Sequence, residues 1–137
     1  MKRIVAFGTF DIFHPGHTSF LNQAKKLGDF LLVVVARDEN VKKIKNKFPN
    51  NFEKKRAQFV RRAKIANKVI LGSRINNYFN TIRSRKIDTI ALGYDQKPSI
   101  IQLRAALKRH RLKNLNIVRL KPYNPNKYKS SKLITNV

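Results

Sequence analysis

Two histidines stand three residues apart in a glycine-containing stretch near the start of the chain. The stretch reads Gly8-Thr9-Phe10-Asp11-Ile12-Phe13-His14-Pro15-Gly16-His17. Imidazole N–H groups donate hydrogen bonds to phosphoryl oxygens, and phosphoryl transfer depends chiefly on positioning and charge stabilisation. The spacing lets His14 and His17 project toward one group. The stretch therefore indicates a phosphate site; the alternative is a pair of surface or helix-capping residues.

The flanking sequence predicts how these residues are held. An apolar run without polar alternation, residues 3–7, is typical of a central parallel strand whose two faces are covered. Pro15 suits the first turn of a helix, apolar residues recur at helical spacing through residues 19–27, and Gly28 follows as a stop. A strand that leads into a helix start offers free N–H groups to an anion, and Gly8 allows close approach to the main chain.

The rest of the chain repeats this alternation of strand and helix. Further apolar runs predict strands at residues 30–36, 69–71, 88–92 and 116–120, and helical periodicity predicts helices at 52–66, 78–84 and 99–111. Alternating strands and helices form parallel sheets with right-handed connections. We therefore expect an α/β fold: a single Rossmann-like, doubly wound domain over residues 1–137, with a five-stranded parallel sheet flanked by helices.

Composition excludes several classes of protein. The chain has 137 residues, 42% of them hydrophobic, and no cysteine. It therefore has no disulfide, no thiolate metal site and no thiol nucleophile. No apolar run approaches the ~20 residues of a membrane span. The N-terminus enters a strand directly, so we expect no signal peptide and a cytoplasmic location.

The charge balance is strongly basic. Thirty-one Lys and Arg residues face 7 Asp and Glu residues, which gives a formal net charge of +24. Such a field attracts polyanions, so nucleic acid is a candidate partner. The charges are spread along the whole chain, however, and no zinc finger or basic zipper is present. We expect any nucleic-acid binding to be incidental to the main function.

The combination of Gly-Thr-Phe-Asp with His-Pro-Gly-His resembles the signature of the cytidylyltransferase-like nucleotidyltransferases. Members of this family move a nucleoside monophosphate from CTP or ATP to a phosphorylated acceptor and release pyrophosphate. The resemblance implies that His14 and His17 are catalytic. It also implies a nucleotide-binding set made of Gly8, Thr9, Phe10, His14, Pro15, Gly16 and His17.

The resemblance extends to charged residues further along the chain. A family lysine that reaches phosphate is best matched by Lys45, with Lys42 as the alternative, or this segment is only a solvated basic loop. Arg56, three residues after Glu53, matches a family arginine and is assigned to the catalytic set, although a structural role also fits. Asp95, after a predicted strand, matches a nucleotide-binding acid or is a plain cap.

The C-terminal part carries the last matches. Ser130 and Ser131 resemble a family motif whose hydroxyls contact the triphosphate, or they cap a final helix. Tyr123 stands in the preceding loop, where relatives often carry an arginine, and joins the nucleotide-binding set. The resemblance implies a divalent ion, Mg²⁺, with the triphosphate, and Asp11 is a candidate ligand through water.

Two branches of the family fit the chain. Ala-Arg-Asp-Glu at residues 36–39 and Leu-Gly-Tyr-Asp-Gln at 92–96 look most like archaeal-type FAD synthases, which transfer AMP from ATP to FMN. The alternative is a CTP-dependent glycerol-3-phosphate cytidylyltransferase, or one acting on another alcohol phosphate. A nucleic-acid-binding module on this fold is a further alternative. Relatives are commonly dimers, so the resemblance implies a homodimer.

Overall fold

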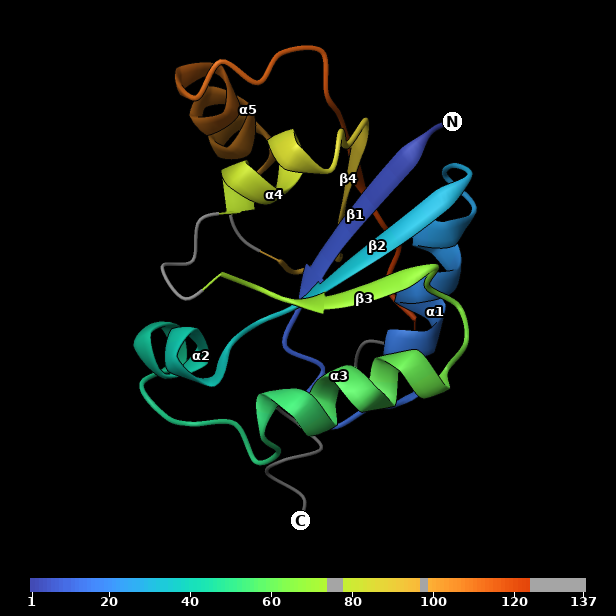
Figure 1. The fold of residues 1–137 in the computed structure, drawn as a ribbon, viewed down its shortest axis with the longest axis vertical. Coiled ribbons are helices and arrows are strands. Elements are labelled where there is room, and N and C mark those ends of the chain that lie inside the picture. Colours follow the sequence, from blue (N-terminus) through green and yellow to red (C-terminus); the bar gives the residue numbers. More distant parts are fainter. Residues whose placement is uncertain (74–77, 97–98, 124–137) are drawn as a thin grey trace.

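The computed structural model describes residues 1–73, 78–96 and 99–123. Strands and helices alternate along the chain, as the sequence predicts (Figure 1). In chain order the elements are β1 (Arg3–Gly8), α1 (Pro15–Lys25), β2 (Phe30–Val35), α2 (Asp38–Lys45), α3 (Glu53–Arg62), β3 (Lys68–Leu71), α4 (Tyr78–Ser84), β4 (Thr89–Leu92), α5 (Ile100–Arg109) and β5 (Asn116–Arg119).

The strands form one five-stranded sheet in the order β3-β2-β1-β4-β5. Every described pairing is parallel, so the prediction of a doubly wound parallel sheet is confirmed. The chain runs outward from β1 to β3, then crosses back to β4 beside β1. Ligands of open α/β sheets bind at this switch point, outside the carboxyl ends of the strands.

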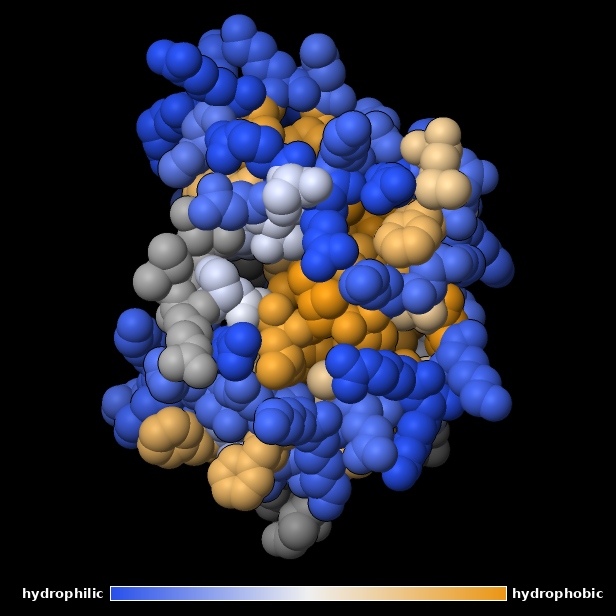
Figure 2. Space-filling view, in the orientation of Figure 1, coloured by the Kyte–Doolittle hydropathy of each residue, from blue (hydrophilic) through white to orange (hydrophobic). Residues whose placement is uncertain are grey.

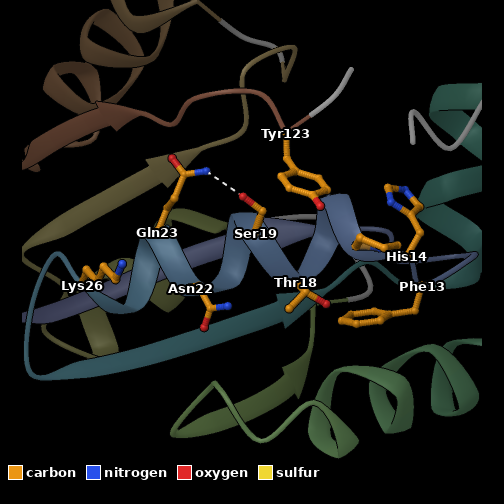
Figure 3. A pocket seen from close by; sticks show the side chains of 9 residues that line it. Phe13, His14, Thr18, Ser19, Asn22, Gln23, Lys26 and Tyr123 are labelled. Carbon is orange, nitrogen blue, oxygen red and sulfur yellow. Dashed lines mark hydrogen bonds between the residues drawn. The ribbon is translucent and has the colours of Figure 1, made fainter. Parts of the chain in front are cut away.

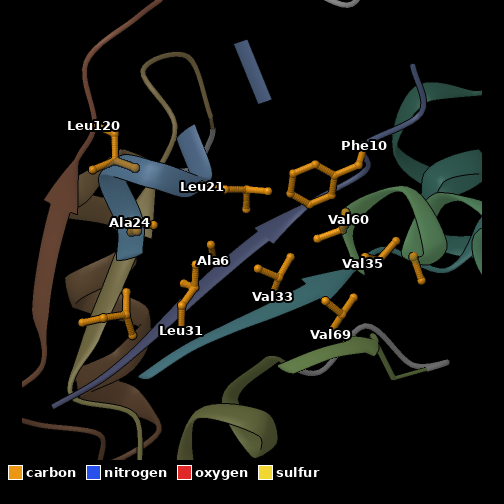
Figure 4. Close-up of a cluster of buried hydrophobic side chains, with 13 residues drawn as sticks. Ala6, Phe10, Leu21, Ala24, Leu31, Val33, Val35, Val60, Val69 and Leu120 are labelled. Carbon is orange, nitrogen blue, oxygen red and sulfur yellow. The ribbon is translucent and has the colours of Figure 1, made fainter. Parts of the chain in front are cut away.

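Hydrophobic side chains cover the sheet on both faces. Alternate residues of β1 and β2 point to opposite sides, which explains their unbroken apolar runs. One face packs against α1 and α3 through Leu21, Ala24 and Val60 (Figure 4). The other face packs against α4 and α5 through Ile82 and Leu103. The two layers fix the loops that follow β1 and β4 at the switch point.

Some helix boundaries differ from the predicted ones. The first helix begins at Pro15, as the sequence predicts, with His14 as its N-cap, and it ends at Lys25, before the predicted end at Leu27. Gly28 therefore does not stop this helix; a Cβ there would meet the carbonyl oxygen of Lys2 at 2.8 Å, so close packing of main chains explains the glycine. α3 ends at Arg62, earlier than predicted, and Lys64 follows in the left-handed conformation with φ 57°.

The face shown in Figure 2 is mainly hydrophilic, with an apolar band across its middle. None of the described helices is long and apolar enough to cross a membrane.

Candidate functional site

The loop after β1 places the two histidines at the start of α1. His14 is the N-cap, and its Nδ1 accepts a hydrogen bond from the main-chain N–H of Gly16 at 3.1 Å. The Nδ1 of His17 accepts from the main-chain N–H of His14 at 3.3 Å. The pair thus forms a reciprocal capping box, and the ring centroids lie 3.9 Å apart. The capping alternative therefore holds for these residues, the two rings lie side by side as their spacing predicts, and their shared phosphate site stays a prediction.

This cap fixes the protonation of both imidazoles. A neutral imidazole whose Nδ1 accepts a hydrogen bond carries its proton on Nε2. Burial lowers the pKa of His14. Burial, then the charges of His14 and Lys45, lower the pKa of His17 to about 3. Rings of Phe10 and Phe13 pack against His17 at centroid distances of 5.3 and 5.4 Å and contribute to this desolvation. Both histidines are therefore neutral Nε2–H donors at neutral pH.

Lys45 and Lys42 lie on the same helix but differ in surroundings. Lys45 is exposed at the end of α2, and its ammonium acts electrostatically on His17. The ammonium of Lys42 instead lies over the ring of Phe48, 5.7 Å from its centroid, and donates to the carbonyl of Asn46. This electrostatic effect favours Lys45 over Lys42, and the assignment of Lys45 to the site stays a prediction.

Arg56 does not occupy the phosphate-binding position that the sequence predicts. Its side chain is completely buried. Its Nε donates to the carbonyl of Asn51 at 2.9 Å, and one terminal nitrogen donates to the carbonyl of Thr9 at 2.8 Å. The other terminal nitrogen forms an ion pair of 2.6 Å with Asp38. Arg56 therefore joins the loop after β1, the loop before α3 and the start of α2 from within the protein, which supports its structural alternative.

Asp11 also has a structural role. It is buried, and its carboxylate accepts hydrogen bonds from the main-chain N–H groups of Asn50 and Asn51, both at 2.8 Å. Both carboxylate oxygens thus hold the loop before α3, and the water-mediated metal ligand stays a prediction. Among residues 1–73, 78–96 and 99–123 no group of three or more His, Cys, Asp or Glu side chains could hold a metal ion.

The remaining loop residues shape the main chain around the histidines. Phe10 is buried and has a φ of 55°, an unusual conformation for a bulky residue. A Cβ on Gly8 would lie 2.6 Å from the ring of Phe10, so the glycine makes room for this ring. Pro15 is the first residue of α1, and the main-chain N–H of Gly16 donates to Nδ1 of the capping residue His14. Thr9 offers its carbonyl to Arg56.

A glutamine at the switch point joins β1 and β4. The Nε2 of Gln96 donates to the carbonyl of Phe7, and its Oε1 accepts from the N–H of Gly93, each at 2.7 Å. Arg119 donates to the carbonyls of Gly93 and Gln96. These contacts hold the loop that exposes Asp95. Sequence reasoning missed the role of Gln96, although its place after a buried strand was a usable signal.

A cavity of about 700 Å³ opens beside His14 along the outer side of α1 (Figure 3). The side chain of Tyr123 extends over this helix toward His14 in the view. Gln23 holds the segment before Tyr123: its Nε2 donates to the carbonyl of Lys121 at 3.0 Å, and its Oε1 accepts from the N–H of Lys121 at 2.9 Å. Sequence reasoning also missed Gln23. Ser130 and Ser131 lie outside the described residues.

Comparisons with known proteins agree with this geometry. A family model described as "Cytidylyltransferase-like" matches residues 5–136. A FAD synthase of Archaeoglobus profundus is 46% identical over 96% of this chain and 82% of its own length. One from Ferroglobus placidus is 46% identical over 88% of this chain and 77% of its own.

A solved structure is similar in fold and sequence. The lipopolysaccharide core biosynthesis protein from Thermoplasma volcanium GSS1 superposes with a TM-score of 0.83 at 37% identity. The match covers 90% of this chain and 99% of that protein.

Proposed function

The chain belongs to the cytidylyltransferase-like family, and from this premise we propose that it is a nucleotidyltransferase that transfers AMP from ATP to FMN. The observation that carries the proposal is the similarity to FAD synthases, which covers 96% of the chain in one relative and 88% in another. The paired neutral imidazoles at the switch point supply chemistry that suits this reaction.

In the proposed reaction a phosphate oxygen of FMN attacks the α-phosphorus of ATP. The new P–O bond forms as the bond between the α-phosphorus and the pyrophosphate oxygen breaks, so the products are FAD and pyrophosphate. His14 and His17 would donate from Nε2 to the phosphoryl oxygens, where charge builds up in the transition state. No covalent enzyme intermediate is required.

Neutral imidazoles have a further consequence for this step. Because burial lowers the pKa of His17 to about 3, its imidazole is neutral near pH 7. It therefore acts as a fixed hydrogen-bond donor and not as a proton donor to the leaving pyrophosphate. The positive charge near the phosphates would come from Lys45, whose ammonium acts on the same histidine.

Magnesium would enter with the nucleotide. Mg²⁺ keeps several waters and is usually held by substrate phosphates with few protein ligands. The described residues, in which the Asp11 carboxylate is already occupied by main-chain N–H groups, fit a metal carried by ATP better than one held by the protein. Binding of nucleotide by Asp95, Tyr123, Ser130 and Ser131 belongs to the same proposal. The homodimer and the cytoplasmic location stay predictions.

The proposal is tested by a substrate panel with purified protein and Mg²⁺. ATP or CTP is combined with FMN or glycerol 3-phosphate, and flavin products and pyrophosphate are quantified. With ATP labelled at the α-phosphorus, we expect label in FAD and one pyrophosphate per FAD. Product only from CTP and glycerol 3-phosphate would overturn the proposed substrates and assign the chain to the other branch.

A further inference from the structure

The loops that lead into the strands lie together at the edge of the sheet opposite the histidines. Every described strand pair is parallel, so the strands begin at one edge, and α1, α3, α4 and α5 end there. Main-chain hydrogen bonds join these connections in a row: Asp29 to Lys2, Asp88 to Arg3, Asn67 to Leu31. We call this surface the amino edge; it comprises residues 2–3, 25–29, 61–68, 83–88 and 108–116.

Nearly all charged residues of the amino edge are basic. Residues 61–64 read Arg-Arg-Ala-Lys, residues 83–86 read Arg-Ser-Arg-Lys, and residues 108–113 read Lys-Arg-His-Arg-Leu-Lys. Its acids are Asp29 and Asp88, and each carboxylate accepts a main-chain N–H, that of Lys2 at 2.7 Å and that of Arg3 at 2.8 Å. The other acids of the chain follow the carboxyl ends of strands or lie in α2 and α3, so they do not offset this charge locally.

The preference of helix C-termini for basic residues does not account for all of the positive charge at the amino edge. Basic residues in the last turn of a helix are favoured by its dipole, but the effect fades beyond that turn. Lys64, Lys86 and Arg111 stand past the ends of α3, α4 and α5 and are exposed. Each has a positive φ, of 57°, 53° and 60°, as the chain turns toward the next strand. Lys68 and Lys113 are exposed beyond them.

We propose that the amino edge binds the phosphate backbone of a nucleic acid, independently of its sequence and apart from the nucleotidyl-transfer site. Mixed Lys and Arg side chains from successive connections suit a line of phosphates. Figure 2 shows hydrophilic side chains along the upper and right rim, over α5 and the starts of the strands.

Surface hydrophobicity favours nucleic acid over an anionic membrane. Peripheral membrane binding combines basic charge with apolar side chains that enter the lipid. Among the described residues the exposed large hydrophobic side chains include Phe48, Phe52 and Ile101, and Met1 is the one that borders the amino edge. The amino edge therefore offers charge with little apolar surface, which is the composition that phosphate-backbone contacts need.

The test compares two variants that each lose four positive charges. The first replaces Lys86, Lys108, Arg109 and Lys113 by Gln at the amino edge. The control replaces Lys43, Lys47, Lys54 and Lys55 by Gln near the carboxyl edge. Binding of a fluorescent DNA duplex of arbitrary sequence is measured by anisotropy at several salt concentrations, and thermal unfolding verifies that both variants fold.

We expect the unmodified protein to bind with a steep salt dependence and the control to bind nearly as tightly. The amino-edge variant should lose at least ~10-fold in affinity, and its salt slope should fall by ~3–4 if each removed charge contacts one phosphate. Equal losses in both variants would overturn the proposal, because they would show an effect of net charge alone. Binding to phosphatidylserine vesicles that exceeds binding to the duplex would overturn it as well.

Discussion

Replacing Arg56 by Ala should destabilise the protein far more than an ordinary surface change on the same helix. The guanidinium is completely buried and satisfies the carbonyls of Thr9 and Asn51 as well as the carboxylate of Asp38. The substitution leaves two carbonyls without their donor and a carboxylate without its counter-charge. Arg62, exposed at the end of α3, provides a matched control.

The magnitude follows from these contacts. Removing one partner of a buried ion pair costs about 3–5 kcal/mol. The side chain of Asp38 is 20% exposed and regains some water, so we expect the lower part of that range, about 3–4 kcal/mol. Arg62→Ala should change the free energy of unfolding by no more than about 0.5 kcal/mol.

Urea unfolding followed by circular dichroism measures both variants. If Arg56→Ala does not fold, Arg56→Lys provides the measurement, because its single ammonium cannot reach three separated acceptors and a loss of about 2 kcal/mol is expected. An Arg56→Ala protein as stable as Arg62→Ala would show that the contacts of the buried guanidinium do not stabilise the fold. If that protein also bound ATP more weakly, the phosphate-binding role predicted from the sequence would be restored.

Three further predictions concern the site and its supports. The folded pKa of His17, about 3, lies below the unfolded value of 6.5, so its contribution to stability is present above pH 6.5 and is lost as the pH falls toward 3. Protonation of His17 in the unfolded state should lower the free energy of unfolding by about 2 kcal/mol between pH 7 and pH 5. Equal free energies of unfolding from urea melts at pH 7 and pH 5 would contradict this. Asp11→Asn should cost about 1–3 kcal/mol, because an amide donor then faces a main-chain N–H. Its KM for ATP should keep its dependence on Mg²⁺, and a change in that dependence without loss of stability would argue for a metal ligand. Gln23→Leu should raise the KM of a substrate more than it lowers kcat, since it frees the segment that leads to Tyr123; an unchanged KM would contradict a role for this segment in binding.

The fold could be predicted from the sequence because its signals are local. Unbroken apolar runs identify strands buried on both faces, and helical periodicity identifies the segments between them. Helix ends were less predictable. The start of α1 at Pro15 follows from the sequence, but α1 ends at Lys25 and α3 at Arg62, before the predicted ends, because the apolar spacing continues into the loops that follow these helices.

The site was predictable in part. The strand, loop and helix start around His14 and His17 follow from the sequence, and so does their closeness. The contacts of Arg56 and Asp11 could not be predicted from the sequence. The charge of a residue alone does not distinguish a buried side chain that joins loops from one that binds a ligand. Gln23 and Gln96 each contact a residue about 90 or more positions away in the chain, and only the folded structure shows these contacts.

The most direct test of the account is the rate of FAD formation by a His17→Asn variant under saturating ATP and FMN. The Asn carboxamide oxygen can accept the N–H of His14 in place of Nδ1, so the helix cap is kept while the Nε2–H donor is removed. His110→Asn, at the exposed end of α5, is the control. We predict that kcat falls by about 10²–10³-fold in the first variant and is unchanged in the second. A folded His17→Asn protein with the kcat of the unmodified chain would contradict the account.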